Sequence, residues 1–299
     1  MVQVPEKLRE QAKSNELILF VGAGVSRNSV INLGGARGVV RPDSWGELLN
    51  RIAFHLGLVD KNTNPLNAEY AELSKSLGPL ELAEYLKFVA KDRSLDGDIR
   101  GWINEGVELP EVGKKFEPNE WHDALLNLGE YGPRVTVTTN YDTLIETKFG
   151  TEGFATYNYK ADNINNILTS PARPILKLHG CVKDLQAPLI ISSSDYQWLE
   201  HEGKLMLDAL RSLLMTRTAL FVGYSLSDPD VNHILSSIFT RHHSSVEPAH
   251  FILHEKSPSI IYRKEMLNKW YGVKVLSYDA SGGRGHDEGL EMLWSIGGR

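Results

Sequence analysis

The chain has 299 residues, enough for one large α/β domain or two smaller ones, and its 41% hydrophobic and 23% charged residues are typical of a globular protein. A formal net charge of −6 argues against a dedicated duplex-DNA binder, so we expect no strong direct nucleic-acid binding. The single cysteine, Cys181, excludes a disulfide framework and a zinc cluster of thiolates. No apolar stretch approaches the ~20 residues that span a bilayer, and the first residues do not resemble a secretory signal, so we expect no membrane partner and a cytoplasmic location.

Short apolar runs recur along the chain, and several are β-branched and nearly continuous, as strands buried on both faces should be. The predicted strands are Leu17–Val21, Val135–Thr139, Ile175–Leu178, Ala219–Val222, His250–Leu253 and Val273–Ser277. Helical patterns between them include Tyr141–Phe149, Pro229–Thr240 and Ile260–Trp270. This alternation predicts an α/β fold with a doubly wound, Rossmann-like parallel sheet of about six strands.

The stretch from residue 61 to residue 130 differs from the rest, because it has helical spacing and no convincing strand. We expect residues 61–130 to form a helical insertion after the first β-α unit. The whole of residues 1–299 would then be one domain that carries this insertion.

The first predicted strand ends in a glycine-rich turn of sequence Gly22-Ala23-Gly24-Val25-Ser26, followed by Arg27. In a nucleotide-binding β-α unit, such glycines let the backbone approach a pyrophosphate, and the next helix directs its free N–H groups at it. Ser26 fits that role, and Arg27 can add charge. The pattern is shorter than the full dinucleotide fingerprint, and an ordinary tight turn explains it about equally well.

Two further strands end in polar side chains. Asn140 lies just past the second predicted strand, and Asp142 opens the following helix, where a plain helix cap is the simpler explanation. His179 ends the third strand and is followed by Gly180, which leaves space beside it. A histidine is suited to act as a general base on a hydroxyl. Because ligands bind at the carboxyl ends of parallel strands, these side chains would share one crevice with Gly22.

The fourth strand is followed by Gly223-Tyr224-Ser225 and then by Asp228. Asp228 precedes a proline, which is a good start for a helix and explains this residue without a function. The helix cap does not explain Gly223 and Ser225, which place a glycine and a hydroxyl at the carboxyl end of the strand. Four polar endings in one sheet favour a dinucleotide site over chance turns.

These four elements, in this order, resemble the sirtuin-like family of NAD-consuming proteins. The matching stretches are Gly22-Ala23-Gly24-Val25-Ser26, Thr139-Asn140-Tyr141-Asp142, His179-Gly180 and Gly223-Tyr224-Ser225-Leu226. The stretches "PDSWGELL", "LKLHG" and "GYSLSDPD" are most similar to the bacterial antiphage-defence branch, which lacks zinc and hydrolyses NAD. The resemblance covers roughly residues 14–60 and 131–280.

The chain also departs from the deacylating members of that family. They carry a four-cysteine zinc module, and they have a glutamine where this chain has Thr139. Their Gly-Ile-Pro-Asp-Phe-Arg motif has no clean counterpart here. The resemblance therefore implies NAD as substrate, with neither zinc nor another metal, and it weakens the case for an acyl-lysine groove.

The resemblance also implies residue roles. Gly22, Ala23, Gly24 and Ser26 would hold the pyrophosphate, with Arg27 beside them. Asn140 and Asp142 would hold the ribose and nicotinamide end, Gly223 and Ser225 would flank the adenosine side, and His179 would be the general base. Thr139, Tyr224 and Asp228 are further expected cofactor-binding residues. Asn140, His179 and Asp142 are thus the expected catalytic residues.

The first hypothesis is an NAD⁺ glycohydrolase (NADase), an enzyme that cleaves the nicotinamide–ribose bond in antiphage defence by NAD depletion. The alternatives are an NAD-dependent protein deacylase and a non-catalytic sensor of NAD or ADP-ribose derivatives. Family resemblance and Trp102, Trp121, Trp198 and Trp270, which fall outside the expected site, favour a homo-oligomer. The resemblance also suggests a HerA-type ATPase or another defence partner.

Overall fold

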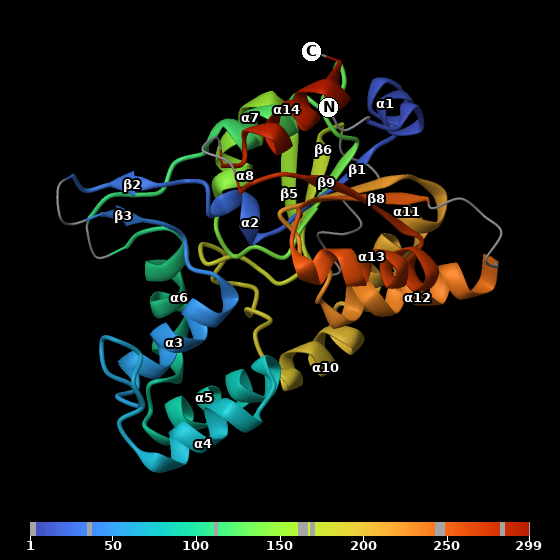
Figure 1. Cartoon of the computed structure of the whole chain (residues 1–299). Helices are drawn as coiled ribbons and strands as arrows, with labels where there is room; N and C mark the ends of the chain where they lie inside the picture. Colours follow the sequence, from blue (N-terminus) through green and yellow to red (C-terminus); the bar gives the residue numbers. More distant parts are fainter. Residues whose placement is uncertain are drawn as a thin grey trace.

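A computed structural model describes residues 4–34, 38–110, 113–160, 167, 171–242, 249–281 and 285–298. Seven parallel strands form its main sheet, in the order β5-β6-β4-β1-β7-β8-β9 (Figure 1). The strands are β1 (Ile18–Val21), β4 (Val135–Thr138), β5 (Phe154–Asn158), β6 (Arg173–Lys177), β7 (Ala219–Val222), β8 (His250–Glu255) and β9 (Val273–Tyr278). The α/β class and all six predicted strands are confirmed.

The strand that the sequence does not predict is β5, so the sheet has seven strands instead of about six. In its sequence, Phe-Ala-Thr-Tyr-Asn, only Phe154 and Tyr157 are buried, because β5 lies at the edge of the sheet. The central strands β1, β4 and β7 are buried at every position; β1 and β7 are continuous apolar runs, and β4 alternates valine with threonine.

The order of the strands reverses around β1. The chain passes from β1 to β4 on one side, and after β6 it crosses to β7 on the other side. In doubly wound sheets, ligands bind outside the carboxyl ends of the strands at such a switch point. The fold therefore directs attention to the loops that follow β1, β4, β6 and β7.

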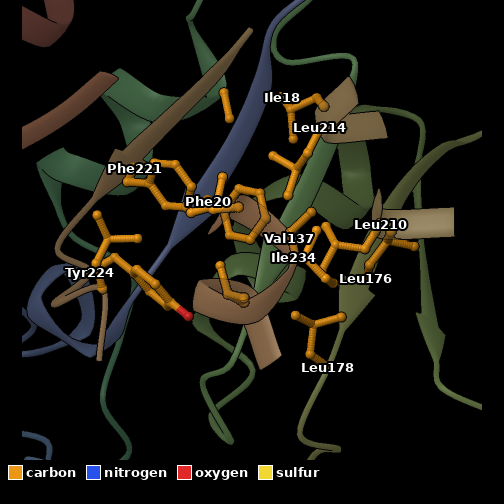
Figure 2. Close-up of a cluster of buried hydrophobic side chains, with 14 of the residues drawn as sticks. Ile18, Phe20, Val137, Leu176, Leu178, Leu210, Leu214, Phe221, Tyr224 and Ile234 are labelled. Carbon is orange, nitrogen blue, oxygen red and sulfur yellow. The ribbon is translucent and has the colours of Figure 1, made fainter. Parts of the chain in front are cut away.

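Helices cover both faces of the sheet. One face packs against α10 (Ser193–Glu202), α11 (Lys204–Thr216), α12 (Pro229–His242) and α13 (Pro258–Tyr271). The other packs against α1 (Glu6–Lys13), α7 (Glu120–Leu126), α8 (Leu144–Phe149) and α14 (Asp287–Gly297). Alternate residues of β1 take part in the two cores: Ile18 and Phe20 lie in the first, which Figure 2 shows, and Leu19 and Val21 lie in the second.

A separate group of helices lies beside the sheet and has its own core. It consists of α3 (Trp45–His55), α4 (Ala68–Ser76), α5 (Pro79–Asp92) and α6 (Ile99–Val107), with the short 3₁₀ turn Asp96–Asp98 before α6 (Figure 1). Helix α3 precedes residue 61 and packs on α5 and α6, whereas α7 packs on α8 and α14 of the sheet core. The division of residues 1–299 into one domain with an insertion at 61–130 stays a prediction.

Two smaller features complete the fold. The strands β2 (Ile31–Asn32) and β3 (Val39–Val40) pair antiparallel, and the 3₁₀ turn Gly150–Glu152 precedes β5. Within the described part of the chain, no helix combines the length and the apolar character that crossing a bilayer requires. Trp102 and Trp121 are buried, so they fill cores and give no support to an oligomer, while Trp198 and Trp270 are exposed.

Candidate active site at the switch point of the sheet

The loops that follow β6, β4, β1 and β7 lie next to one another, because these four strands are neighbours in the sheet. In the pairing of β4 with β6, Thr138 is opposite Lys177. Asn140 and His179 each follow that pair by two residues, so both leave the sheet at the same level. The rings of Tyr141 and His179 are 6.5 Å apart between centroids. The structure thus brings the two expected catalytic residues together at one edge.

The two glycines after β1 are required by the backbone of the loop after β7. A Cβ atom on Gly22 would lie 2.3 Å from the carbonyl oxygen of Gly223, and one on Gly24 would lie 2.8 Å from the Cα of Gly223. Gly223 itself has a positive φ of 61°, which a side chain would strain. The contact between the two loops therefore explains why Gly22 and Gly24 lack side chains, and their expected contact with a pyrophosphate stays a prediction.

Two hydrogen bonds join these loops. The N–H of Gly22 donates to Val222 at 3.0 Å, and the N–H of Gly24 donates to Gly223 at 2.9 Å. Both N–H groups are thus already occupied in this structure. Ala23, which begins the four-residue helix α2 (Ala23–Ser26), is exposed at the mouth of the loop.

The side chain of Arg27 is directed toward helix α3. Its guanidinium pairs with Glu47 and donates to the carbonyl of Pro42 at 2.9 Å. Glu47 also closes the capping box of α3 with Ser44. Arg27 thus has a structural role in this arrangement, and its expected contact with phosphate stays a prediction.

Ser26 connects the glycine loop to the loop after β4. Its hydroxyl donates to Oδ2 of Asp142 at 2.8 Å and accepts from Nδ2 of Asn140 at 3.0 Å. All three side chains are buried. The amide nitrogen of Asn140 is fixed by Ser26, and its Oδ1 has no hydrogen-bond partner among the described residues. The amide oxygen of Asn140 is thus available to accept a hydrogen bond from a substrate or a water.

Asp142 has a local role as well. Its Oδ1 accepts from the N–H of Leu144 at 3.1 Å, so it satisfies a free N–H at the start of α8. The preceding N–H, that of Thr143, donates to Glu108 at the end of α6. Helix α8 consequently begins at Leu144, three residues later than the predicted helix at Tyr141–Phe149.

A buried ion pair contacts the backbone of the loop after β4, which carries Asp142. Lys177, at the end of β6, lies 2.7 Å from Oε1 of Glu146 and also donates to the carbonyl of Asp142. Burial alone lowers the pKa of Lys177, but the neighbouring charge of Glu146 outweighs it and raises the pKa above its ordinary value. Burial raises the pKa of Glu146, and Lys177 opposes this rise. Removal of either partner would leave an unpaired buried group beneath Asp142.

His179 lies against an acidic side chain from the loop after β7. Its Nε2 is 2.9 Å from Oδ2 of Asp228, and both side chains are 7% exposed. Burial and the charge of Asp228 raise the pKa of the nearby Asp230 to about 7. The sequence predicts Asp228 as a helix cap and a cofactor-binding residue, and it does not predict this contact with His179.

Gly180 has a positive φ of 80°, and an added Cβ atom would lie 2.7 Å from the carbonyl oxygen of Pro188. The glycine after His179 therefore serves a tight turn against the chain at Pro188. The expectation that it leaves open space beside His179 is wrong.

The remaining expected contacts divide between the core and the surface. Tyr224 is buried, packs on Phe20 and Phe221, and is part of the core in Figure 2. Thr139 lies near its hydroxyl and is half-buried. Ser225 is exposed, and its hydroxyl lies 2.6 Å from that of Ser227. The structure thus separates Tyr224 from the mouth of the site.

Comparison with known proteins finds a family that is similar to this part of the chain. Residues 134–276 match the SIR2-like domain family. The matched range contains the loops of Asn140, His179 and Asp228, whereas the Gly22 loop lies before it.

Curated relatives extend the similarity beyond the SIR2-like domain match. The chain is 29% identical over 237 residues to "NAD(+) hydrolase ThsA" of Enterococcus faecium, which covers 78% of the chain and 42% of the relative. It is 33% identical over 240 residues to the protein of that name from Cytobacillus dafuensis, with 79% and 40% covered. It is 24% identical over 262 residues to "Defense-associated sirtuin 2" of Bacillus subtilis, with 86% and 23% covered. The chain spans less than half the length of these relatives.

Several residues around the candidate site were not identified from the sequence. Tyr196 contacts Asp228, Glu108 contacts Thr143, and Lys177 with Glu146 lies beneath Asp142. Only Lys177 had a signal in the sequence, a lysine inside an otherwise apolar strand. In the ranges that the structure describes, no group of three or more His, Cys, Asp or Glu residues is arranged to hold a metal ion.

Proposed function

We propose that this chain is an NAD⁺ glycohydrolase that cleaves the bond between nicotinamide and ribose and acts in antiphage defence by depleting NAD. The observation that carries the proposal is the position of Asn140 and His179, two residues past the paired Thr138 and Lys177, at one edge of a sheet whose residues 134–276 match a SIR2-like domain. The names of the relatives, NAD hydrolase and defence-associated sirtuin, support the same reaction. The proposal concerns the whole protein and remains to be tested by experiment.

The reaction needs little from the protein. Water replaces nicotinamide at the anomeric carbon, so NAD⁺ and water give nicotinamide, ADP-ribose and a proton. Nicotinamide is a good leaving group because the bond to be broken joins a cationic ring to the sugar. The site must orient the water and stabilise an oxocarbenium-like transition state.

The side chains at the switch point suit these tasks. The free Oδ1 of Asn140 can accept a hydrogen bond from the attacking water, and Ser26 holds that amide in place. His179 can accept a proton from a ribose hydroxyl or from the water. Asp142 acts through Ser26, because both of its carboxylate oxygens are already engaged by the protein.

The test is release of nicotinamide from NAD by the full chain, alone and with its candidate partners. Asn140→Ala and His179→Ala should each reduce turnover by about 10²–10⁴-fold, the usual contribution of a positioned acid–base group. Both side chains are buried and hydrogen-bonded, so each variant should also lose some stability, and a cooperative unfolding transition shows that it is folded under the assay conditions.

Three outcomes decide between the functions. Wild-type rates from both folded variants would contradict the assignment. Binding of NAD without cleavage by the wild type would favour the sensor, and removal of an acyl group from lysine peptides would favour the deacylase.

Family resemblance is also the basis for the oligomeric state, the location and the partner that we propose. The protein would form a homo-oligomer in the cytoplasm and act with a HerA-type ATPase or another defence partner. Light scattering of the purified chain, alone and mixed with candidate partners, tests the assembly. A monomer of 33.4 kDa in every mixture would contradict it.

A further inference from the structure

The contact between His179 and Asp228 determines which ring nitrogen of the histidine is free. An ionised carboxylate only accepts hydrogen bonds, so in the 2.9 Å contact the hydrogen is on Nε2. The other nitrogen, Nδ1, has no hydrogen-bond partner among the described residues. Because a neutral imidazole carries one N–H, its lone pair is then on Nδ1.

The carboxylate of Asp228 is itself held from three directions. Its Oδ2 also accepts from the hydroxyl of Tyr196 at 2.8 Å, and its Oδ1 accepts from the N–H of Val231 at 3.0 Å. Burial raises the pKa of Asp228, but the interactions with His179, Val231 and Tyr196 together outweigh burial and leave the pKa below its ordinary value. Asp228 is therefore a fixed acceptor.

The loop that carries Asp228 is held in an unusual conformation. Leu226 has a positive φ of 50°, which is strained for a residue other than glycine, and its side chain is buried. Asn232 donates to its carbonyl at 3.0 Å, and Arg263 donates to the same carbonyl at 3.4 Å. Such strain persists only where the surroundings support it, and here it places Asp228 against His179.

We propose that Asp228 is a positioning residue that holds His179 in the tautomer with hydrogen on Nε2 and makes Nδ1 the proton acceptor. The consequence for turnover rests on the proposed NAD cleavage, whereas the tautomer is a property of this chain alone. In the reaction, the O–H bond of the ribose hydroxyl or the water breaks and an N–H bond forms at Nδ1. The imidazolium that results lies beside the negative charge of Asp228 until it returns its proton to solvent.

Asp228 also caps helix α12, and a good test separates the two roles. In Asp228→Asn, the side-chain oxygen can still accept from Val231, and asparagine is as good an N-cap as aspartate. The new NH₂ group can donate to Nε2 of His179. The hydrogen of the imidazole should then move to Nδ1, which leaves the wrong nitrogen free.

The decisive measurement is the ¹⁵N spectrum of the histidine-labelled full chain at about pH 9, well above the ordinary histidine pKa of about 6.5. The chain has 10 histidines, and the spectrum of His179→Gln identifies the signals of His179. We expect hydrogen on Nε2 in the wild type and on Nδ1 in Asp228→Asn. Hydrogen on Nδ1 in the wild type, or on Nε2 in both proteins, would overturn the proposal. Should Asp228→Asn fail to fold, the wild-type spectrum alone decides.

Kinetics provide the second readout. Asp228→Asn should lower kcat for NAD cleavage by about 10³-fold or more, as expected when a catalytic histidine is held in the wrong tautomer, and change KM by no more than about threefold. The matched control is Asp208→Asn, which removes an exposed carboxylate paired with Lys204 and should leave kcat unchanged.

The two proposals fail in different ways. A tautomer change with unaltered kcat would exclude the positioning role. A wild-type protein that never cleaves NAD would refute the proposed function, while the spectrum would still decide the tautomer.

Discussion

Ser26 is the residue on which the expected binding role and the observed contacts disagree most clearly. Its hydroxyl is engaged by Asp142 and Asn140, so in this structure it positions an amide. Contact with a pyrophosphate would require one of these bonds to break. The two roles lead to different kinetic effects, because an interaction that aligns a catalytic group changes kcat, whereas uniform binding changes KM.

Ser26→Ala should therefore lower kcat for nicotinamide release by about tenfold or more, with little change in KM. It should also destabilise the fold by about 1–3 kcal/mol, because Asp142 and Asn140 lose a buried partner. Steady-state kinetics and urea unfolding measure the two effects. Ser76→Ala, which removes an exposed hydroxyl on α4, is the control. A rise in KM alone would instead support phosphate binding by Ser26.

At the scale of elements, the loops after β1 and β7 touch through their backbones. Gly22→Ala should destabilise the protein by about 3 kcal/mol, at the upper end of the cost of overpacking, because its Cβ atom would meet Gly223 and Tyr224. Gly101→Ala is the matched control within α6, where an added Cβ meets nothing within 4 Å. That variant should stabilise the protein by about 0.5–1 kcal/mol. Denaturant unfolding compares them, and equal stability of the two variants would contradict the prediction.

The loop after His179 depends on a helix outside the sheet layers. Arg100 of α6 donates to the carbonyls of Cys181 at 2.6 Å, Asp184 at 2.9 Å and Ala187 at 2.6 Å. One guanidinium therefore holds the turn that follows the expected base. This contact links the group of helices α3 to α6 to the site.

Arg100→Ala should accelerate amide hydrogen exchange in residues 182–190 and lower kcat for nicotinamide release. Lys183→Ala is the control, since it removes an exposed contact between the same loop and Asn104. Exchange measured by mass spectrometry on peptides of this loop gives the result. An unchanged rate of amide hydrogen exchange in Arg100→Ala would show that the turn keeps its conformation without Arg100.

The sequence predicts much of the sheet because central parallel strands must be apolar on both faces. It also locates Asn140 and His179, since polar residues directly after such strands lie at the ligand-binding edge. It does not predict β5, whose edge position removes the continuous apolar run. The contacts of Tyr196 and Arg100 with the site loops were also missed. Both residues lie in helices whose sequence contains no motif of a functional site. They reach the site loops only because segments distant in the sequence pack together.

At the scale of the whole molecule, two buried histidines make stability depend on pH. Burial lowers the pKa of His250 and of His122 to about 4. The unfolded chain binds protons at these sites near the ordinary value of about 6.5, so it takes up protons before the folded protein does. Their contribution to stability is complete above pH ~6.5 and is lost as the pH falls toward ~4.

The free energy of unfolding should therefore fall by about 3 kcal/mol for each of these histidines between pH ~6.5 and ~4. His250→Asn should make the free energy of unfolding less dependent on pH, because asparagine does not titrate. The asparagine oxygen can replace Nδ1 as acceptor for the N–H of Ala219. Urea unfolding across this pH range measures the effect, with the exposed His233→Asn as control. An unchanged slope in His250→Asn would contradict the assignment.

The contact between the β1 and β7 loops also restricts which sequences can keep this fold. Gly22, Gly24 and Gly223 each face the backbone of the opposite loop, so an added methyl at one position cannot be accommodated by trimming another. In a protein core, a larger side chain at one position can be compensated by a smaller one at its neighbour. Glycine has no side chain to shorten, so no such compensation is possible among these three positions. In a library of all single and double substitutions, we expect the three positions to be intolerant individually and to show no compensating partner among themselves.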